Sequence, residues 1–335
     1  MRENFGTLPD GQLVERLTIS GHGLMASVIT LGASLQDLRL AGIGHPLVLG
    51  YPTLSPYLSE GRFFGAIVGR CANRISSGVA EIEGRTYVLD RNERDRTTLH
   101  GGADGTGRRN WKVVEQGTDF VILADELPDG HMGFPGRLEV RVIYRILPEL
   151  SLQITIEAKS DATTLCNFAQ HSYFNLDGQK DLSDHILCVP ANTYLPVDGD
   201  LIPLGSPAPV EGSHLDFREP VRLGNRLGGE LVDHNLCVSL ARTDTPKPVA
   251  TLTAGELSMR ILSTEPGLQV YTADHLQPGS QGIGGFPYGK HAGVALESQV
   301  WPDAIHHPDY PSAILPAGQS YRQITILSFA VPRES

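Results

Sequence analysis

The chain has 335 residues, of which 40% are hydrophobic and 19% are charged, and its 27 basic and 38 acidic side chains give a net charge of −11. Disordered proteins have fewer apolar residues and denser charge, so this composition excludes them and indicates a globular protein. The acidic balance, without any block of Lys and Arg, also argues against nucleic acid or an anionic membrane surface as a partner.

Four cysteines, Cys71, Cys166, Cys188 and Cys237, lie far apart and form no C-x-x-C pair. This spacing argues against a zinc site or a dense disulfide framework, so free thiols in a reducing cytoplasm are expected. No apolar secretory signal and no apolar run of about 18 residues is visible. We therefore expect a soluble, cytoplasmic protein, and nothing in the sequence indicates its oligomeric state.

Runs in which apolar and polar residues alternate with a period of two follow one another along most of the chain, as in half-buried strands. In chain order they lie at residues 13–19, 25–31, 36–40, 111–116, 119–124, 138–146, 151–158, 185–190, 249–253, 258–263, 268–272, 292–297 and 321–329. Only a short turn separates 138–146 from 151–158, which predicts a β-hairpin. Residues 192–205 are rich in Pro and Gly and are predicted to form a long loop.

Long segments with the helical period of 3.6 residues are missing, and the 37 Gly and 23 Pro fall in turns between the strand-like runs. Many strands joined in this way predict an all-β protein with little helix, in which large antiparallel sheets pack face to face. No repeat of fixed period and no break in composition is visible, so residues 1–335 are predicted to form a single domain.

The segments GRCANRIS (69–76) and TLHGG (98–102) contain polar residues that simple alternation does not explain. Asn73 and Arg74 carry amide and guanidinium donors that suit sugar hydroxyls or a sugar ring oxygen. His100 precedes two glycines, which are expected to let the backbone approach a ligand closely. The alternatives are a surface salt bridge for Arg74 and a plain turn residue for His100.

The segment CNFAQHSYFNL (166–176) places an imidazole directly before two aromatic rings. Tyr173 and Phe174 could form walls around His171 that stack on a sugar and exclude water. The alternative is that both rings belong to the core and that His171 only caps them.

Glu297 follows the apolar residues 294–296 at the end of a predicted strand, where a carboxylate is unusual unless it faces a cleft. Apolar neighbours raise the pKa of a carboxyl group, which suits a general base that works near neutral pH. The alternative is a strand-end side chain in solvent. Most of the 12 histidines are expected to be incidental, and the adjacent His306 and His307 are only weak candidates for metal ligands.

Together, these segments resemble the aldose 1-epimerase (galactose mutarotase) family over nearly the whole chain. Seven motifs match those of the family in the same order, and Glu297 lies in the last of them. The motifs are GRCANRI (69–75), TLHGG (98–102), QHSYFNL (170–176), LPVDGDLIPLG (195–205), VDHN (232–235), PGLQVYT (266–272) and LESQVWPDAIHHPDYPSAILPAGQSY (296–321).

The resemblance implies a β-supersandwich fold, a free monosaccharide substrate such as galactose or glucose, and a site without metal or organic cofactor. It also implies that Glu297 is the catalytic base and His171 the catalytic acid in the exchange of sugar anomers. We expect Glu297 to start ionised and His171 to start protonated. The residues to which the resemblance assigns sugar binding are Asn73, Arg74, His100, Asp233 and Gln269.

Three positions depart from the family pattern. Gln170 stands where Asn is usual, residues 105–111 lack an aromatic that is often present, and residues 273–275 read Ala-Asp-His where Gly-Asn is usual. None of these changes touches the predicted acid or base, but they leave the preferred sugar open.

Three alternative functions remain. A hexose-6-phosphate 1-epimerase would need cationic contacts to the phosphate, for which Arg108 and Arg109 are candidates. A glycosidase would need two carboxylates, for which Glu297 and Asp233 are candidates. A sugar-binding protein without activity would be expected to lose the acid or the base, whereas this chain has both Glu297 and His171.

Overall fold

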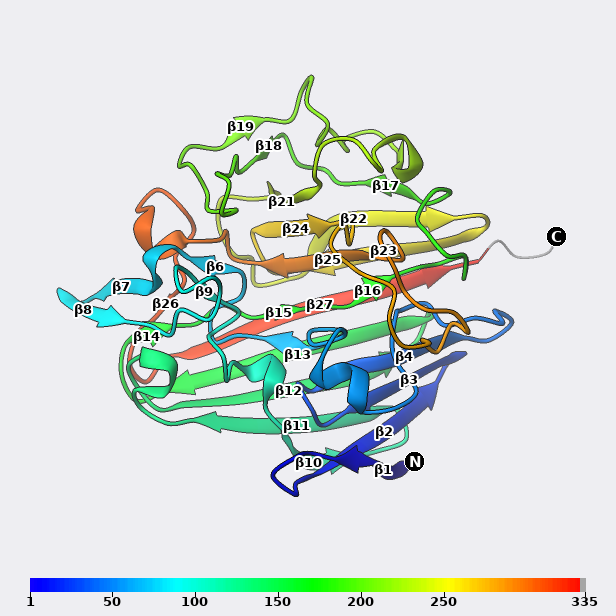
Figure 1. Cartoon of the computed structure of the whole chain (residues 1–335), viewed down its shortest axis with the longest axis horizontal. Coiled ribbons are helices and arrows are strands. Elements are labelled where there is room, and N and C mark those ends of the chain that lie inside the picture. Colours follow the sequence, from blue (N-terminus) through cyan, green and yellow to red (C-terminus); the bar gives the residue numbers. More distant parts are fainter. Residues whose placement is uncertain (332–335) are drawn as a thin grey trace.

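The computed structural model describes residues 1–331, which fold mainly into antiparallel strands (Figure 1). The largest sheet has nine strands, in the spatial order β10 (Lys112–Gln116), β11 (Phe120–Leu127), β12 (Leu138–Leu147), β13 (Ser151–Ser160), β27 (Ser320–Ala330), β23 (Leu257–Ser263), β22 (Lys247–Ala254), β17 (Ile186–Cys188) and β20 (Val221–Arg222). A six-stranded sheet follows the order β16 (Tyr173–Phe174), β25 (Val294–Gln299), β24 (Gly267–Tyr271), β21 (Asp233–Cys237), β18 (Thr193–Tyr194) and β19 (Ala208–Pro209).

The remaining strands form smaller sheets. Four strands pair in chain order, namely β1 (Arg2–Thr7), β2 (Leu13–Gly21), β3 (Leu24–Ile29) and β4 (Ser34–Leu40). Four two-stranded sheets join β5 (Ile67–Val68) to β15 (Ala169–Gln170), β6 (Arg74–Ile75) to β9 (Thr98–Leu99), β7 (Val79–Ile82) to β8 (Arg85–Val88), and β14 (Thr164–Leu165) to β26 (Ile314–Leu315).

Helical structure in residues 1–331 is limited to short 3-10 segments. These are η1 (Ser55–Leu58), η2 (Ser76–Gly78), η3 (Thr106–Arg108), η4 (His131–Gly133), η5 (Leu223–Asn225) and η6 (Ala304–His306). None of the helical segments in this part of the chain is long and apolar enough to cross a membrane.

Every predicted strand-like run overlaps a strand, and the predicted hairpin is confirmed. β12 and β13 pair from Leu138 opposite Ser160 to Leu147 opposite Ser151, and the inward residues of β12 are apolar and buried. The run 185–190 forms only a short strand, and β1, β7, β8, β21 and all strands of two residues were not predicted. Alternation therefore found the long core strands, and the strands that it missed have six residues or fewer.

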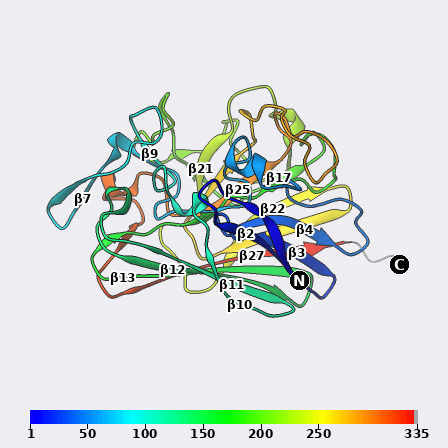
Figure 2. The same cartoon turned by 60° about the horizontal axis from the view of Figure 1, so that its bottom comes forward.

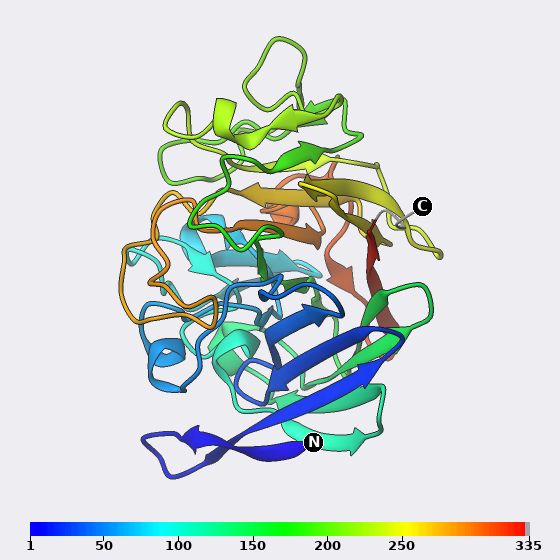
Figure 3. The ribbon, with the colours of Figure 1, turned by 90° about the vertical axis from the view of Figure 1, so that its right-hand side faces the viewer.

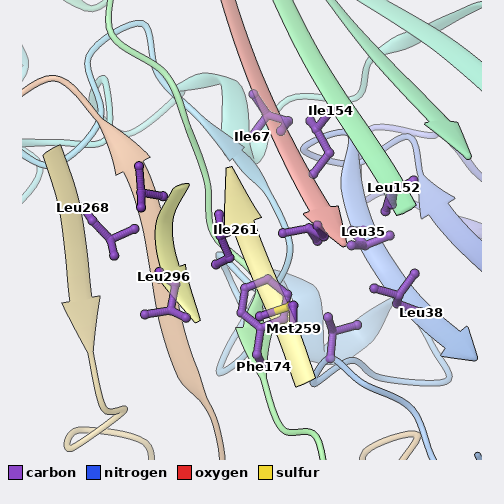
Figure 4. Close-up of a cluster of buried hydrophobic side chains, with 14 of the residues drawn as sticks. Leu35, Leu38, Ile67, Leu152, Ile154, Phe174, Met259, Ile261, Leu268 and Leu296 are labelled. Carbon is purple, nitrogen blue, oxygen red and sulfur yellow. The ribbon is translucent and has the colours of Figure 1, made fainter. Parts of the chain in front are cut away.

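The six-stranded sheet packs one of its faces into the main apolar core. Leu268 of β24 and Leu296 of β25 belong to the same buried cluster as Ile154 of β13 and Ile261 of β23 (Figure 4). Successive side chains of a strand point to opposite faces, so the residues that follow Leu268 and Leu296 point away from this core. That second face is where the predicted site residues lie.

The sheets lie on different sides of the molecule. Figure 2 shows β10 to β13 and β27 along one side of the molecule, with β9, β21 and β25 on the other. Figure 3 shows the N-terminal sheet of β1 to β4 at the end opposite the yellow-green segment around residues 200–235. The main core draws residues from Leu17 to Phe329, and a single domain remains the prediction.

Candidate active site

Three polar side chains lie on the face of the six-stranded sheet that points away from the main core. Gln269 on β24 is paired with Glu297 on β25, and Asp233 on β21 is paired with Tyr271, two residues further along β24. Gln269 Nε2 donates a hydrogen bond of 2.6 Å to Asp233 Oδ1. Glu297 and Gln269 are only 3% and 4% exposed. The sheet therefore brings three predicted site residues together inside the protein.

The sequence predicted that Glu297 ends its strand. This prediction is wrong, because β25 continues to Gln299. Its carboxyl group is buried, which excludes the alternative of a solvated strand end. Burial raises the pKa of Glu297 to about 8; the charge of Asp233 adds to this increase and the charge of Arg74 opposes it. Such a carboxyl group can exchange its proton near neutral pH, as general acid–base catalysis requires.

His171 lies between β15 and β16 and contacts Glu297. Its N–H donates to the carbonyl oxygen of Ala66 at 2.8 Å, and its own carbonyl accepts from the N–H of Gly65 at 2.9 Å. The imidazole Nε2 is 3.7 Å from Glu297 Oε1. Burial lowers the pKa of His171 to about 4. The predicted acid and base are thus neighbours, although they are distant in the sequence.

These pKa directions reverse the starting state expected for the pair. Burial favours a protonated Glu297 and a neutral His171 near neutral pH, whereas the expected state had Glu297 ionised and His171 protonated. Both states contain one movable proton and the same total charge. A proton transfer between the two groups converts one state into the other, and hydrogen bonds from a ligand to the carboxylate would favour the ionised form.

Aromatic rings surround His171, and one of the two predicted walls is confirmed. The ring centroid of Tyr173 is 5.1 Å from that of His171. The prediction for Phe174 is wrong, because the next residue of the strand points to the opposite face and packs into the main core (Figure 4). Phe63, which was not predicted, lies 6.1 Å from the ring of His171 and 4.9 Å from that of His100.

Asn73 and His100 are fixed to each other by the pairing of β6 and β9. The N–H of His100 donates to Asn73 O at 3.0 Å, and the N–H of Asn73 donates to His100 Nδ1 at 3.2 Å. Both residues have positive φ, 59° and 51°, which is uncommon without glycine. Because Nδ1 accepts a hydrogen bond, the neutral ring carries its proton on Nε2. His100 is therefore both a turn residue and a buried member of the site.

Gly101, the first glycine after His100, is required by the fold, and the approach of a ligand at this turn stays a prediction. Gly101 has a φ of +84°, and a Cβ atom there would lie 2.0 Å from the carbonyl oxygen of Gly69. A side chain at this position would push the backbone at Gly69 out of place. Gly101 thus allows two backbone segments to cross beside the site.

Arg74 forms a bidentate ion pair with Glu93, a residue that the sequence did not single out. Arg74 Nε donates to Glu93 Oε2 at 2.8 Å and Nη2 donates to Oε1 at 2.9 Å. The two side chains are 13% and 22% exposed, so this is not the surface salt bridge considered above. Burial acts to lower the pKa of Arg74, but Glu93 and the charges of Asp233 and Glu297 raise it overall. The cation lies within electrostatic reach of the site carboxylates.

His100, His171 and Glu297 also form a group that could hold a metal ion, with ligand atoms within 4.8 Å of one another. The fit is loose, because His171 Nε2 and Glu297 Oε1 are 3.7 Å apart, whereas adjacent ligands of tetrahedral zinc are about 3.3 Å apart. His171 Nδ1 has no hydrogen-bond partner within residues 1–331, and metal-bound histidines almost always donate this second N–H. The three side chains suit proton transfer better, and a site without a metal remains the prediction.

The sequence of the chain matches that of known proteins. The profile of one family, described as Aldose 1-epimerase, matches residues 15–328. The chain belongs to the aldose 1-epimerase family. It is 37% identical to the galactose mutarotase of Rattus norvegicus over 98% of each chain. It is 32% identical to the aldose 1-epimerase of Escherichia coli K12, over 98% of this chain and 99% of that one.

The fold of the aldose 1-epimerase family is also found by superposition. A solved aldose epimerase homologue from C. elegans has a TM-score of 0.87 to this chain at 26% identity, covering 94% of this chain and 98% of that one. The predicted all-β supersandwich is thereby confirmed.

The departures from the family pattern lie around the acid–base pair and not in it. Gln170 is buried and donates to Gly65 O and Ser172 Oγ, so its amide serves the local fold. His275 lies against Tyr271, with ring centroids 6.3 Å apart, at the edge of the row that contains Asp233. Tyr271 was missed, although residues two apart on a strand share a face and Gln269 had been singled out.

Asp303, in the closing motif of the family, ties two parts of the site together. It has a φ of 57°, and its Oδ1 accepts from the N–H of Ser76 at 2.9 Å and from His306 Nδ1 at 2.7 Å. Its own N–H donates to the carbonyl oxygen of Arg74 at 3.1 Å. His306 and His307 both contact Asp303, which gives them a structural partner.

Proposed function

We propose that this protein is an aldose 1-epimerase, which interconverts the α and β anomers of a free aldose by opening and closing the sugar ring. The observation that carries the proposal is the buried pair of His171 and Glu297, 3.7 Å apart, in a chain of this family. Opening a hemiacetal requires one group that takes up a proton and a second group that gives one up.

The reaction breaks the bond between C1 and the ring oxygen. Glu297 removes the proton of the C1 hydroxyl while His171 delivers a proton to the ring oxygen, and C1 becomes an aldehyde carbon. After rotation about the C1–C2 bond, His171 takes back the proton and Glu297 returns one to the C1 oxygen as the ring closes on the other face. The two groups therefore exchange the roles of acid and base within each turnover.

The remaining residues would hold the sugar hydroxyls. Gln269 Oε1 and Glu297 Oε2 are buried and have no hydrogen-bond partner within the described part of the chain, residues 1–331. Hydroxyl groups of a monosaccharide would satisfy both atoms, and such bonds would favour an ionised Glu297. The other residues proposed to bind sugar hydroxyls are Asn73, Arg74, His100 and Asp233.

The pair predicts a specific dependence of kcat/KM on pH. Below pH about 4 both groups hold a proton, and above pH about 8 neither does. Only the singly protonated pair has both an acid and a base, so activity should be high between these limits and fall on either side. The two limits belong to the pair as a unit.

Polarimetry tests the proposal. Freshly dissolved α-D-galactose and α-D-glucose should approach their equilibrium rotation much faster with the wild-type protein than in buffer. Glu297→Gln should lower kcat by about 10²- to 10⁴-fold, the usual contribution of one general acid–base group. Glu139→Gln, an exposed carboxylate on β12, is the control. Rates no faster than buffer across a panel of aldoses would refute the activity, and an active Glu297→Gln variant would refute the assigned base.

The alternative functions fit these contacts less well. Arg109 is held by Asp104 and Asp125 at 2.6 Å each, so Arg108 alone of the two candidate arginines is left to bind a phosphate. Asp233 lies on the same face of the same sheet as Glu297, whereas the carboxylates of a glycosidase flank the scissile bond. Glucose 6-phosphate, measured in parallel, separates a phosphate-specific enzyme from one for free sugars.

A further inference from the structure

We infer that Glu93 is a positioning residue for the reaction: it holds the guanidinium of Arg74 beside the substrate position and away from the catalytic carboxylate. The inference rests on the proposed function. Neither the motifs nor the spacing of the sequence pointed to Glu93, and it acts through Arg74 without taking part in proton transfer.

Glu93 is itself fixed by the segment that carries it. Its Oε2 accepts a hydrogen bond of 2.8 Å from Thr97 Oγ1, and the two residues exchange backbone hydrogen bonds of 3.2 Å. Thr97 is only 4% exposed. Three hydrogen bonds therefore join Glu93 to Thr97, one of them to the carboxylate, so the carboxylate offers Arg74 one well-defined position.

The same segment is joined to the strand that leads to His100. Asn92 Nδ2 donates to the carbonyl oxygen of Leu99 at 3.0 Å, and the N–H of Leu99 donates to Asn92 Oδ1 at 2.8 Å. Leu99 pairs with Arg74 across β9 and β6. Glu93, Arg74 and His100 thus share one local framework, and a change at Glu93 would act first on Arg74.

The surrounding charges explain why Arg74 needs such a partner. The charged and titratable groups around Glu297 are Asp233, Arg74, His100, His171 and the phenol of Tyr173. Apart from Glu93, the carboxylates whose charges act on Arg74 are those of Asp233 and Glu297, so these would attract the guanidinium once Glu93 is removed. An ion pair with Glu297 would stabilise its ionised form and reduce its ability to take up the proton.

Glu93→Gln tests the inference, because it keeps the size of the side chain and removes its charge. We expect kcat/KM to fall about 10- to 100-fold, the range of a hydrogen bond to a charged group. The alkaline limit of the pH profile should move from about 8 to lower pH by roughly half a unit to one unit, because the cation then acts more strongly on Glu297. Glu93→Asp should restore part of the activity.

Arg96→Gln is the matched control. Arg96 lies on the same segment, is 67% exposed and pairs with Asp200, so its loss should leave both kcat/KM and the pH profile unchanged. If Glu93→Gln does not fold, Thr97→Val, which removes one donor to Glu93, should shift the same two quantities in the same direction by a smaller amount.

A double-mutant cycle decides between positioning and a general structural role. In an Arg74→Lys background, Glu93→Gln should lower kcat/KM by less than about threefold, because the partner that it positions is already altered. The inference would be overturned if the effects of the two substitutions on kcat/KM multiply fully, or if Glu93→Gln keeps the kinetics and pH limits of the wild type. In either case, an active wild-type protein leaves the proposed function standing. An inactive wild type would overturn both.

Discussion

The strand pairs β12–β13 and β24–β25 are both antiparallel and both buried, but their facing side chains are of opposite kinds. Across β12 and β13, Val142 faces Ile156 and packs into the main core. Across β24 and β25, Gln269 faces Glu297, and polar atoms of both lack partners in residues 1–331. The first pair gains free energy from burial, whereas the second loses free energy by burying groups that water would solvate.

The six-stranded sheet has both kinds of face, one apolar and one that carries the predicted site residues. Leu268 and Leu296 anchor β24 and β25 in the core, and the adjacent Gln269 and Glu297 face the site. The apolar face can hold the strands in place while the polar face remains incompletely satisfied. A substitution on the apolar face should therefore change stability, and one on the polar face should change catalysis.

Ile154→Ala on β13 is expected to give the largest effect on stability. Ile154 is 2% exposed in the main core, and removal of such a side chain typically costs about 2–5 kcal/mol. Urea unfolding measures the loss, and Val114→Ala, at a side chain that is 52% exposed, is the control. The pH limits of kcat/KM should not move, and the comparison fails if they do.

Glu297→Gln should stabilise the protein increasingly as the pH rises. The wild-type carboxyl group has its pKa raised from 4.5 to about 8 by burial, so the folded state holds this proton more tightly than the unfolded state. Wild-type stability is thus lost between pH 4.5 and about 8, and the variant lacks this loss. We expect its advantage to grow by on the order of 3 kcal/mol across this window. Glu157→Gln, at a side chain of β13 that is 41% exposed, is the control. If the difference in stability between Glu297→Gln and the wild type did not change with pH, the burial argument would be contradicted.

Phe63→Leu should give the smallest effect and change only the site. The lost contacts with the rings of His100 and His171 should lower kcat/KM by roughly three- to tenfold. Water that reaches His171 should raise its pKa above about 4, so the acid limit of the profile moves to higher pH. Phe174→Leu, in the core, should instead lower stability and leave that limit in place. If both variants change stability and the acid limit in the same way, the distinction between the core and the site is contradicted.

How much of each region could be predicted from the sequence depended on whether its residues alternate between apolar and polar. Alternation predicted β12 and β13 because every second residue is apolar and buried. It missed β21 (Asp233–Cys237) because DHNLC places polar side chains where the site needs them. The partnership of His171 and Glu297 came from the resemblance to a family, since nothing in their spacing brings them together. Glu93 and Phe63 lie outside the strands, where only tertiary contacts reveal a role.

The contacts of Asp303 determine which segments of such a protein can change in sequence without moving the site. Its hydrogen bonds to Ser76 and Arg74 tie the segment after β25 to the segment that carries the arginine, so one side-chain and one backbone hydrogen bond help to set the spacing of Glu297 and Arg74. Outer loops such as 276–289 are not part of this linkage. Changes in the sequence of those loops can therefore leave the spacing of Glu297 and Arg74 as it is.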